Sequence, residues 1–99
     1  MDMMKKYASE ICEELEGAKS YAECYVDCKV RGNSNSATKF KEMATDELKH
    51  ASYMHAMAAH YMEEMGKAIS IPENISFEWQ ECNSEYACKV ACVKQMLTL

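Results

Sequence analysis

The fold is decided by residues 39–65, which read KFKEMATDELKHASYMHAMAAHYMEEM. On a helix, at about 100° per residue, the apolar positions of this segment fall on one stripe. They are Phe40, Met43, Ala44, Ala51, Met54, Ala58, Tyr61, Met62 and Met65. Glu47 falls at the centre of this stripe and His50 on its border. Because burying an unpaired charge costs several kcal/mol, Glu47 must be paired, protonated or bound to a metal ion, and we interpret it as a metal ligand.

The composition bounds the fold and the function. A chain of 99 residues makes one domain, and one proline and three glycines with many Ala, Glu, Lys and Met residues favour an all-α fold. The net charge of −5, without a cluster of Lys and Arg, argues against nucleic-acid binding. No apolar run reaches the ~18 residues of a membrane span, and no signal peptide opens the chain, so we expect a cytoplasmic protein without a membrane partner.

Three helices are expected. The first covers about residues 2–31, with Asp2 as N-cap and Gly32 as the C-terminal stop. The second covers about residues 36–65, is capped by Ser34 or Ser36, and ends at Gly66. So short a connection forces these two helices into an antiparallel hairpin. A third, shorter helix is expected at about residues 77–97, after a connection that contains Pro72, and it should pack on the hairpin.

Two expected apolar stripes belong to the first and third helices. They are Met4, Tyr7, Ile11, Leu15, Ala18, Ala22 and Tyr25 in the first, and Trp79, Cys82, Tyr86, Val90, Val93 and Leu97 in the third. At 1.5 Å per residue the first two helices would each be about 45 Å long. Helices of this length are unusual in so small a chain, and they favour a bundle that is shared with another subunit.

The pair Glu47-x-x-His50 places a carboxylate and an imidazole on one helix face. In four-helix bundles that bind two iron or manganese ions, this pair recurs together with a single Glu from the preceding helix. Carboxylates bridge and neutralise two divalent ions, and one imidazole per ion leaves coordination positions open. Glu14 precedes Glu47 by 33 residues. In a hairpin that bends near residue 33, positions 14 and 50 are about equally far from the bend and should meet.

These residues give the chain a resemblance to the ferritin-like superfamily, in particular to rubrerythrins and half-length encapsulated ferritins. The resemblance rests on Glu13–Glu14–Leu15–Glu16 with Tyr21, and on Asp46–Glu47–Leu48–Lys49–His50–Ala51, and it covers about residues 11–61. It implies that Glu14, Glu47 and His50 are the metal ligands and that Tyr21 lies beside them. It also implies that Glu13 or Glu16 lies near the route by which ions arrive.

The resemblance has a consequence for assembly. Rubrerythrins carry two sets of Glu plus ExxH in one chain, whereas this sequence has one. A second set from a two-fold related subunit would complete a four-helix core, with two iron or manganese ions per interface of a homodimer or larger homo-oligomer. The implied chemistry is that of a ferroxidase or a rubrerythrin-like oxidoreductase, namely oxidation of Fe(II) or reduction of oxygen or peroxide. The cysteines lack the CxxC spacing of the rubredoxin-like electron donor, which argues against a self-sufficient peroxidase.

Two alternatives remain open at the level of sequence. Glu47 and His50 could form a buried hydrogen-bonded pair, with Tyr21 nearby, in a bundle that holds no metal. The chain would then be a metal-free helical module for dimerisation or docking. Metal analysis separates the two hypotheses, because only the first predicts bound ions.

The remaining cysteines, histidines and methionines are interpreted as structural. Cys24 and Cys28 are spaced four residues apart, and so are Cys88 and Cys92. If the first and third helices face each other, the two pairs could bind zinc or form disulfides. Alternatively, these cysteines could fill space in a secondary packing face. Cys12 and Cys82 have no evident partner. We expect the methionines to pack in the core, and His55 and His60 to lie at the surface.

Overall fold

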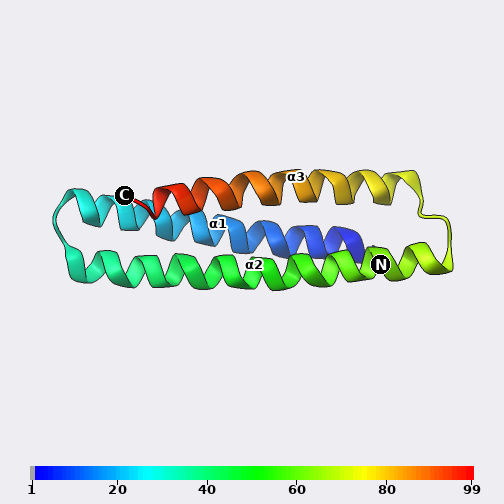
Figure 1. The fold of residues 1–99 in the computed structure, drawn as a ribbon, viewed down its shortest axis with the longest axis horizontal. Helices are drawn as coiled ribbons and strands as arrows, with labels where there is room; N and C mark the ends of the chain where they lie inside the picture. The colour runs from blue at the N-terminus through cyan, green and yellow to red at the C-terminus, as the bar shows by residue number, and fades with distance from the viewer. Residues whose placement is uncertain (1) are drawn as a thin grey trace.

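The computed structural model describes residues 2–99, which form three helices joined by two short connections (Figure 1). The helices are α1 (Met3–Val30), α2 (Ser34–Ala68) and α3 (Glu73–Met96). No strand occurs within this part of the chain, so the predicted all-α class is confirmed. Figure 1 shows that α2 runs antiparallel to α1 and that α3 returns in the same direction as α1. The molecule is a rod that measures 55 × 19 × 16 Å along its principal axes.

The predicted residues at the start and end of α1 are confirmed, whereas the predicted cap of α2 is wrong. Asp2 caps α1 by accepting a hydrogen bond from the backbone N–H of Lys5 at 3.1 Å. Gly32 follows α1 with φ of +74°, a conformation that glycine adopts without steric cost. The cap of α2 is Asn33, whose side-chain oxygen accepts from the N–H of Ser36 at 3.2 Å. The predicted serine caps are therefore wrong, and both serines lie inside the helix.

The second connection is shorter than predicted. α2 continues through Gly66 to Ala68, and α3 begins four residues earlier than expected, at Glu73. Pro72 precedes that first residue with φ of −57°, close to the helical value, so the ring prepares the start of the helix. Pro72 lies in the connection, as predicted, and is the last residue before α3.

The core of the hairpin repeats every seven residues on both helices. Buried residues at this spacing are Met4, Ile11, Ala18 and Tyr25 in α1, and Ala37, Ala44, Ala51 and Ala58 in α2. The predicted stripe of α1 is confirmed, with Tyr7 half-buried and its other members buried. In α2 the alanines define the centre of the stripe, and Met43 is exposed although it was predicted to face the core. Small side chains allow two helices to pack closely, so the alanines set which side of α2 faces α1.

α3 packs chiefly against α1, which lies between α2 and α3 in the view of Figure 1. Its buried residues are Cys82 and Val93, with Leu97 just beyond its end. The hydroxyl of Tyr25 donates to the backbone carbonyl of Leu99 at 2.8 Å, and Lys89 Nζ lies 3.0 Å from Glu16 Oε1. These contacts fix α3 along one side of the hairpin.

His55 provides a side-chain link from α2 to α3. Its ring stacks on Tyr86, with 4.1 Å between the ring centroids, and on Trp79 at 5.2 Å, and it shares a hydrogen bond with Asn83. The prediction that His55 lies at the surface is therefore wrong, because α3 covers the side of α2 on which it sits. His60 is exposed, as predicted.

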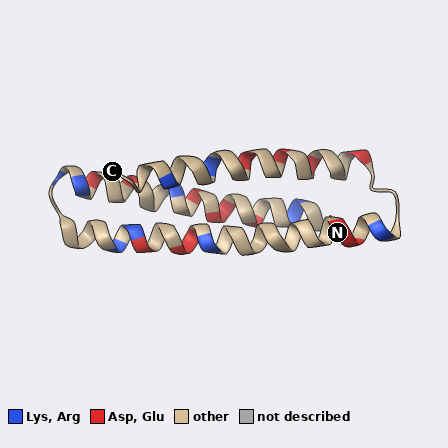
Figure 2. Ribbon diagram, in the orientation of Figure 1, with Lys and Arg blue, Asp and Glu red and all other residues tan. Residues whose placement is uncertain are grey.

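No helix within residues 2–99 combines the length and the apolar character needed to cross a membrane. Figure 2 shows acidic and basic residues on all three helices, with the acidic residues of α3 in its first part and Lys89 and Lys94 in its second, and no continuous basic stretch appears in the coloured part.

Candidate metal centre

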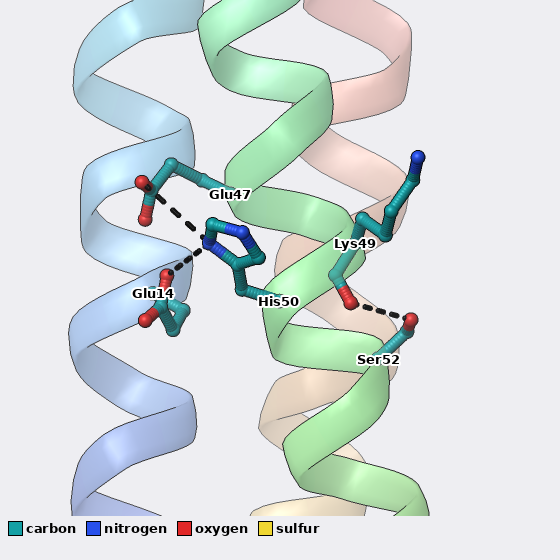
Figure 3. Close-up of polar contacts among 5 residues, drawn as sticks. All are labelled: Glu14, Glu47, Lys49, His50 and Ser52. Carbon is teal, nitrogen blue, oxygen red and sulfur yellow. Dashed lines mark hydrogen bonds and ion pairs between the residues drawn. The ribbon is translucent and has the colours of Figure 1, made fainter.

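Glu14, Glu47 and His50 meet at the junction of α1 and α2 (Figure 3). Nδ1 of His50 lies 3.4 Å from Oε2 of Glu14 and 4.0 Å from Oε1 of Glu47. One potential ligand atom from each residue lies within 4.8 Å of the other two. Across residues 2–99 no other three His, Cys, Asp or Glu side chains meet this condition. The three residues that were predicted from sequence as ligands are thus brought together.

Glu47 is more exposed than its predicted place at the centre of the apolar stripe implies. Its side chain is 27% exposed, as is that of Glu14, and the side chain of His50 is 54% exposed. No charged or polar side chain is fully buried in the described part of the chain. Glu47 lies at the edge of the hairpin and not at the centre of its core, because the alanines and not the larger apolar residues direct α2 toward α1. In Figure 3 the three side chains lie in front of the hairpin, and α3 passes behind α2.

The two carboxyl groups interact strongly. The pKa of Glu47 lies above its ordinary value, first because the protonated group hydrogen bonds to Glu14, then because burial removes water and Glu14 is negatively charged. The nearby His50 partly offsets these effects. Two carboxylates side by side therefore hold a proton, or another cation, more readily than an isolated carboxylate does.

Two further observations fit a bound cation. Oε2 of Glu14 is buried and has no hydrogen-bond partner, a property that it shares with Oε2 of Glu78. A buried acceptor without a partner carries a desolvation cost that a metal ion would remove. In addition, Gly17 leaves room for the carboxylate of Glu47, because a Cβ at position 17 would lie 3.1 Å from Oε2 of Glu47. A donor set of two carboxylates and one imidazole suits divalent iron, manganese or zinc.

Gly17 was not singled out in the sequence. A glycine inside a helix costs up to about 1 kcal/mol relative to alanine, so its presence in the middle of α1 calls for a packing reason. The signal was available, since position 17 lies one turn from Glu14 on the same helix.

The other residues that the resemblance implied are placed elsewhere or remain untested. Tyr21 lies two turns from Glu14 along α1, and its ring stacks on Phe40 with 6.4 Å between the centroids. Its predicted role beside the ligands stays a prediction. Glu16 hydrogen bonds to Lys89 of α3, so it lies on the covered side of the hairpin and not beside a route to the metal site. Glu13 is exposed.

The four-cysteine hypothesis is not supported. All six cysteines are free thiols, and none belongs to a group of three potential metal ligands in residues 2–99. α3 runs parallel to α1 with Lys89 beside Glu16, which places Cys88 and Cys92 level with the middle of α1 and away from Cys24 and Cys28. Cys28 is buried in the core, as the interpretation of these cysteines as packing residues predicts, whereas Cys88 and Cys92 are exposed and do not fit it.

The raised pKa of Glu47 predicts how the stability of the metal-free protein depends on pH. Because the folded state holds a proton to a higher pH than the unfolded chain does, the stabilising contribution of this group is present at low pH. It is lost as pH rises through the folded pKa. In a ¹³C NMR titration with chelator present, Glu47 should titrate at a higher pH than Glu16, whose pKa is lowered by Lys89. Titration of Glu47 below Glu16 would contradict the proximity of the two carboxyls.

Comparison with known proteins adds no identification. No family model, no curated protein and no solved structure matches the chain. The class of this protein is therefore defined by its fold and site alone, as an all-α protein with a carboxylate–histidine cluster at the edge of a helical hairpin.

Proposed function

We propose that this chain binds divalent iron or manganese through Glu14, Glu47 and His50, at a site that a second copy completes. The single observation that carries the proposal is the convergence of these three side chains, from positions far apart in the sequence, around a buried carboxylate oxygen without a hydrogen-bond partner. The space that Gly17 leaves for Glu47 supports the same reading.

A second copy is proposed because one chain supplies only half of the usual ligand set. Carboxylate-bridged sites in helical bundles take two single glutamates and two ExxH pairs, and a two-fold axis beside His50 would provide them. The uncovered face of the hairpin suits such an interface. Met43 and Met57 lie one heptad before and after His50, and both are exposed. A shallow groove of about 450 Å³ lies at Met57, and it is lined by Tyr7, Ala56, Met57, His60, Tyr61 and Glu64.

The three proposed ligands have distinct roles. The carboxylates of Glu14 and Glu47 would neutralise the ions and hold them close together, while His50 would add a neutral ligand and leave positions open. When bound, Fe(II) would be oxidised to Fe(III), and the electrons that it loses would reduce oxygen or peroxide. The function proposed is therefore that of a ferritin-like protein in the broad sense, with ferroxidase or rubrerythrin-like chemistry at the centre.

A metal-free dimerisation module is the second candidate, favoured by the exposed Met43, Tyr53 and Met57 on α2. Single exposed apolar residues are normal, but three along one helix mark a contact surface. Both candidates predict a dimer, so the mass of the protein alone does not separate them.

The decisive experiment measures ions and chains together. The protein is loaded anaerobically with Fe(II), or with Mn(II), then desalted and examined by elemental analysis and native mass spectrometry. We expect a dimer that carries about one ion per chain. His50→Ala should lose the ions, and Lys49→Ala, which changes an exposed side chain that points away from the three ligands in Figure 3, should keep them. A dimer without ions would support the second candidate, and a metal-free monomer would refute both.

A further inference from the structure

A second feature of the molecule lies between α1 and α3 and does not depend on the metal proposal. An open cavity of about 260 Å³ separates these helices on one side of the rod, and both Cys12 and Cys82 line it. Its floor is apolar, from Ala8, Ile11 and Leu15, and its rim carries Lys5, Glu78 and Glu85. The two thiols come from positions that are 70 residues apart in the sequence. Neither had an evident partner before the fold was known.

The surroundings give the two thiols different properties. Cys82 is 8% exposed, while Cys12 is half-buried at the mouth of the cavity. Burial raises the pKa of Cys82, and negative charge on Glu85 and on Cys12 adds to the effect. Lys89, whose pKa is raised mainly by its hydrogen bond to Glu16, also interacts with Cys12. A cation therefore lies near the more accessible thiol and carboxylates lie near the less accessible one.

We infer that Cys12 and Cys82 form a dithiol that a peroxide oxidises to an intramolecular disulfide linking α1 to α3. Cys12 is the attacking thiol, because it is half-buried and a small oxidant in the cavity can reach it, whereas Cys82 is buried. Cys82 comes from α3 and lines the same cavity, so it is the resolving thiol.

The two steps balance in atoms and electrons. The sulfur of Cys12 attacks one oxygen of the peroxide, the O–O bond breaks, one water leaves, and Cys12 becomes a sulfenic acid. The sulfur of Cys82 then displaces the hydroxyl group, an S–S bond forms, and a second water leaves. The two thiols lose two electrons and both protons, which reduce one hydrogen peroxide to two waters.

The disulfide would have a large effect on stability. It closes a loop of 70 residues, and the stabilisation that a crosslink provides grows with loop length. The link lies on the side of α1 that faces α3, away from the face that presents Glu14, Glu47 and His50. It would therefore fix α3 on the hairpin and leave the metal site uncovered.

The test uses hydrogen peroxide and protein that has been freed of metal with a chelator. In the wild-type protein, peptide mapping without reductant should show the Cys12–Cys82 crosslink as the first disulfide formed, with a loss of two hydrogen atoms from the intact mass. The melting temperature should rise by about 10 °C or more and should fall again on addition of dithiothreitol.

Two variants serve as matched controls. One keeps only Cys12 and Cys82, and should behave like the wild type. The other keeps only Cys88 and Cys92, which are both exposed on α3, and should show no rise in melting temperature. Disulfides only between chains, or a sulfinic acid on Cys12 with Cys82 still reduced, would each overturn the inference. Loss of iron binding would leave it unaffected, because the experiment is done without metal.

Discussion

Replacement of Glu47 by glutamine is expected to abolish metal binding and to leave the metal-free protein at least as stable as the wild type. The amide has nearly the same size, but it cannot neutralise or bridge divalent ions. Loss of groups that merely support metal ligands costs about 10- to 100-fold in affinity, so loss of this ligand should cost at least about a hundredfold. The measurement is metal content after loading and desalting, together with a titration of Mn(II).

The stability of the same variant gives an independent readout. Without metal, Glu47 and Glu14 repel each other once both are charged, and Glu47→Gln removes this repulsion. The difference in melting temperature between variant and wild type should therefore grow as pH rises from about 4 to 7. Glu63→Gln changes an exposed carboxylate on the same helix and is the matched control. A variant that kept wild-type metal content would show that Glu47 is not a ligand.

Replacement of Gly17 by alanine is expected to leave α1 folded and to weaken metal binding at the site. The added Cβ would lie 3.1 Å from Oε2 of Glu47, which is closer than nearly all such contacts, so the carboxylate must move by a few tenths of an ångström. Since a glutamate side chain is flexible at its end, the helix should remain folded and gain up to about 1 kcal/mol from the better helix former. Metal affinity should fall about tenfold or more, because the ligand no longer occupies its place.

Gly66→Ala provides the comparison for this substitution. A Cβ there would lie 3.4 Å from Cδ1 of Ile71, an ordinary contact, and the position is remote from the three ligands. This variant should therefore keep the metal affinity of the wild type. Equal metal affinity in the two alanine variants would show that the space beside Gly17 does not hold Glu47 in place.

The hairpin and the membership of the site could be predicted from local sequence. Gly32 and the seven-residue recurrence of apolar positions define two long helices and the bend between them, and the geometry of the hairpin then brings position 14 to position 50. The exact face of α2 could not be predicted in this way. A periodicity analysis weights Met43 and Ala44 alike, whereas close packing against α1 selects the alanine and leaves the methionine exposed.

The features that depend on α3 were beyond reach of the sequence. The apolar periodicity of α3 does not predict which side of the hairpin this helix covers. His55 was therefore predicted to lie at the surface, and no partner was predicted for Cys12 or Cys82. These differences arise from tertiary packing and not from the local preferences of the residues.

The seven-residue repeat also limits how this hairpin can change in length. A strict repeat of seven winds two helices gently around each other, and it returns each buried position to the same side only after two complete turns. Lengthening or shortening both arms between the bend and Glu14 by whole repeats would carry the glutamates and the histidine along the rod and still present them together. An indel in one arm alone would separate Glu14 from Glu47 and His50, either by rotation or, for one whole repeat, by about 10.5 Å along the axis. The two arms of such a protein can therefore change in length only together, in steps of seven.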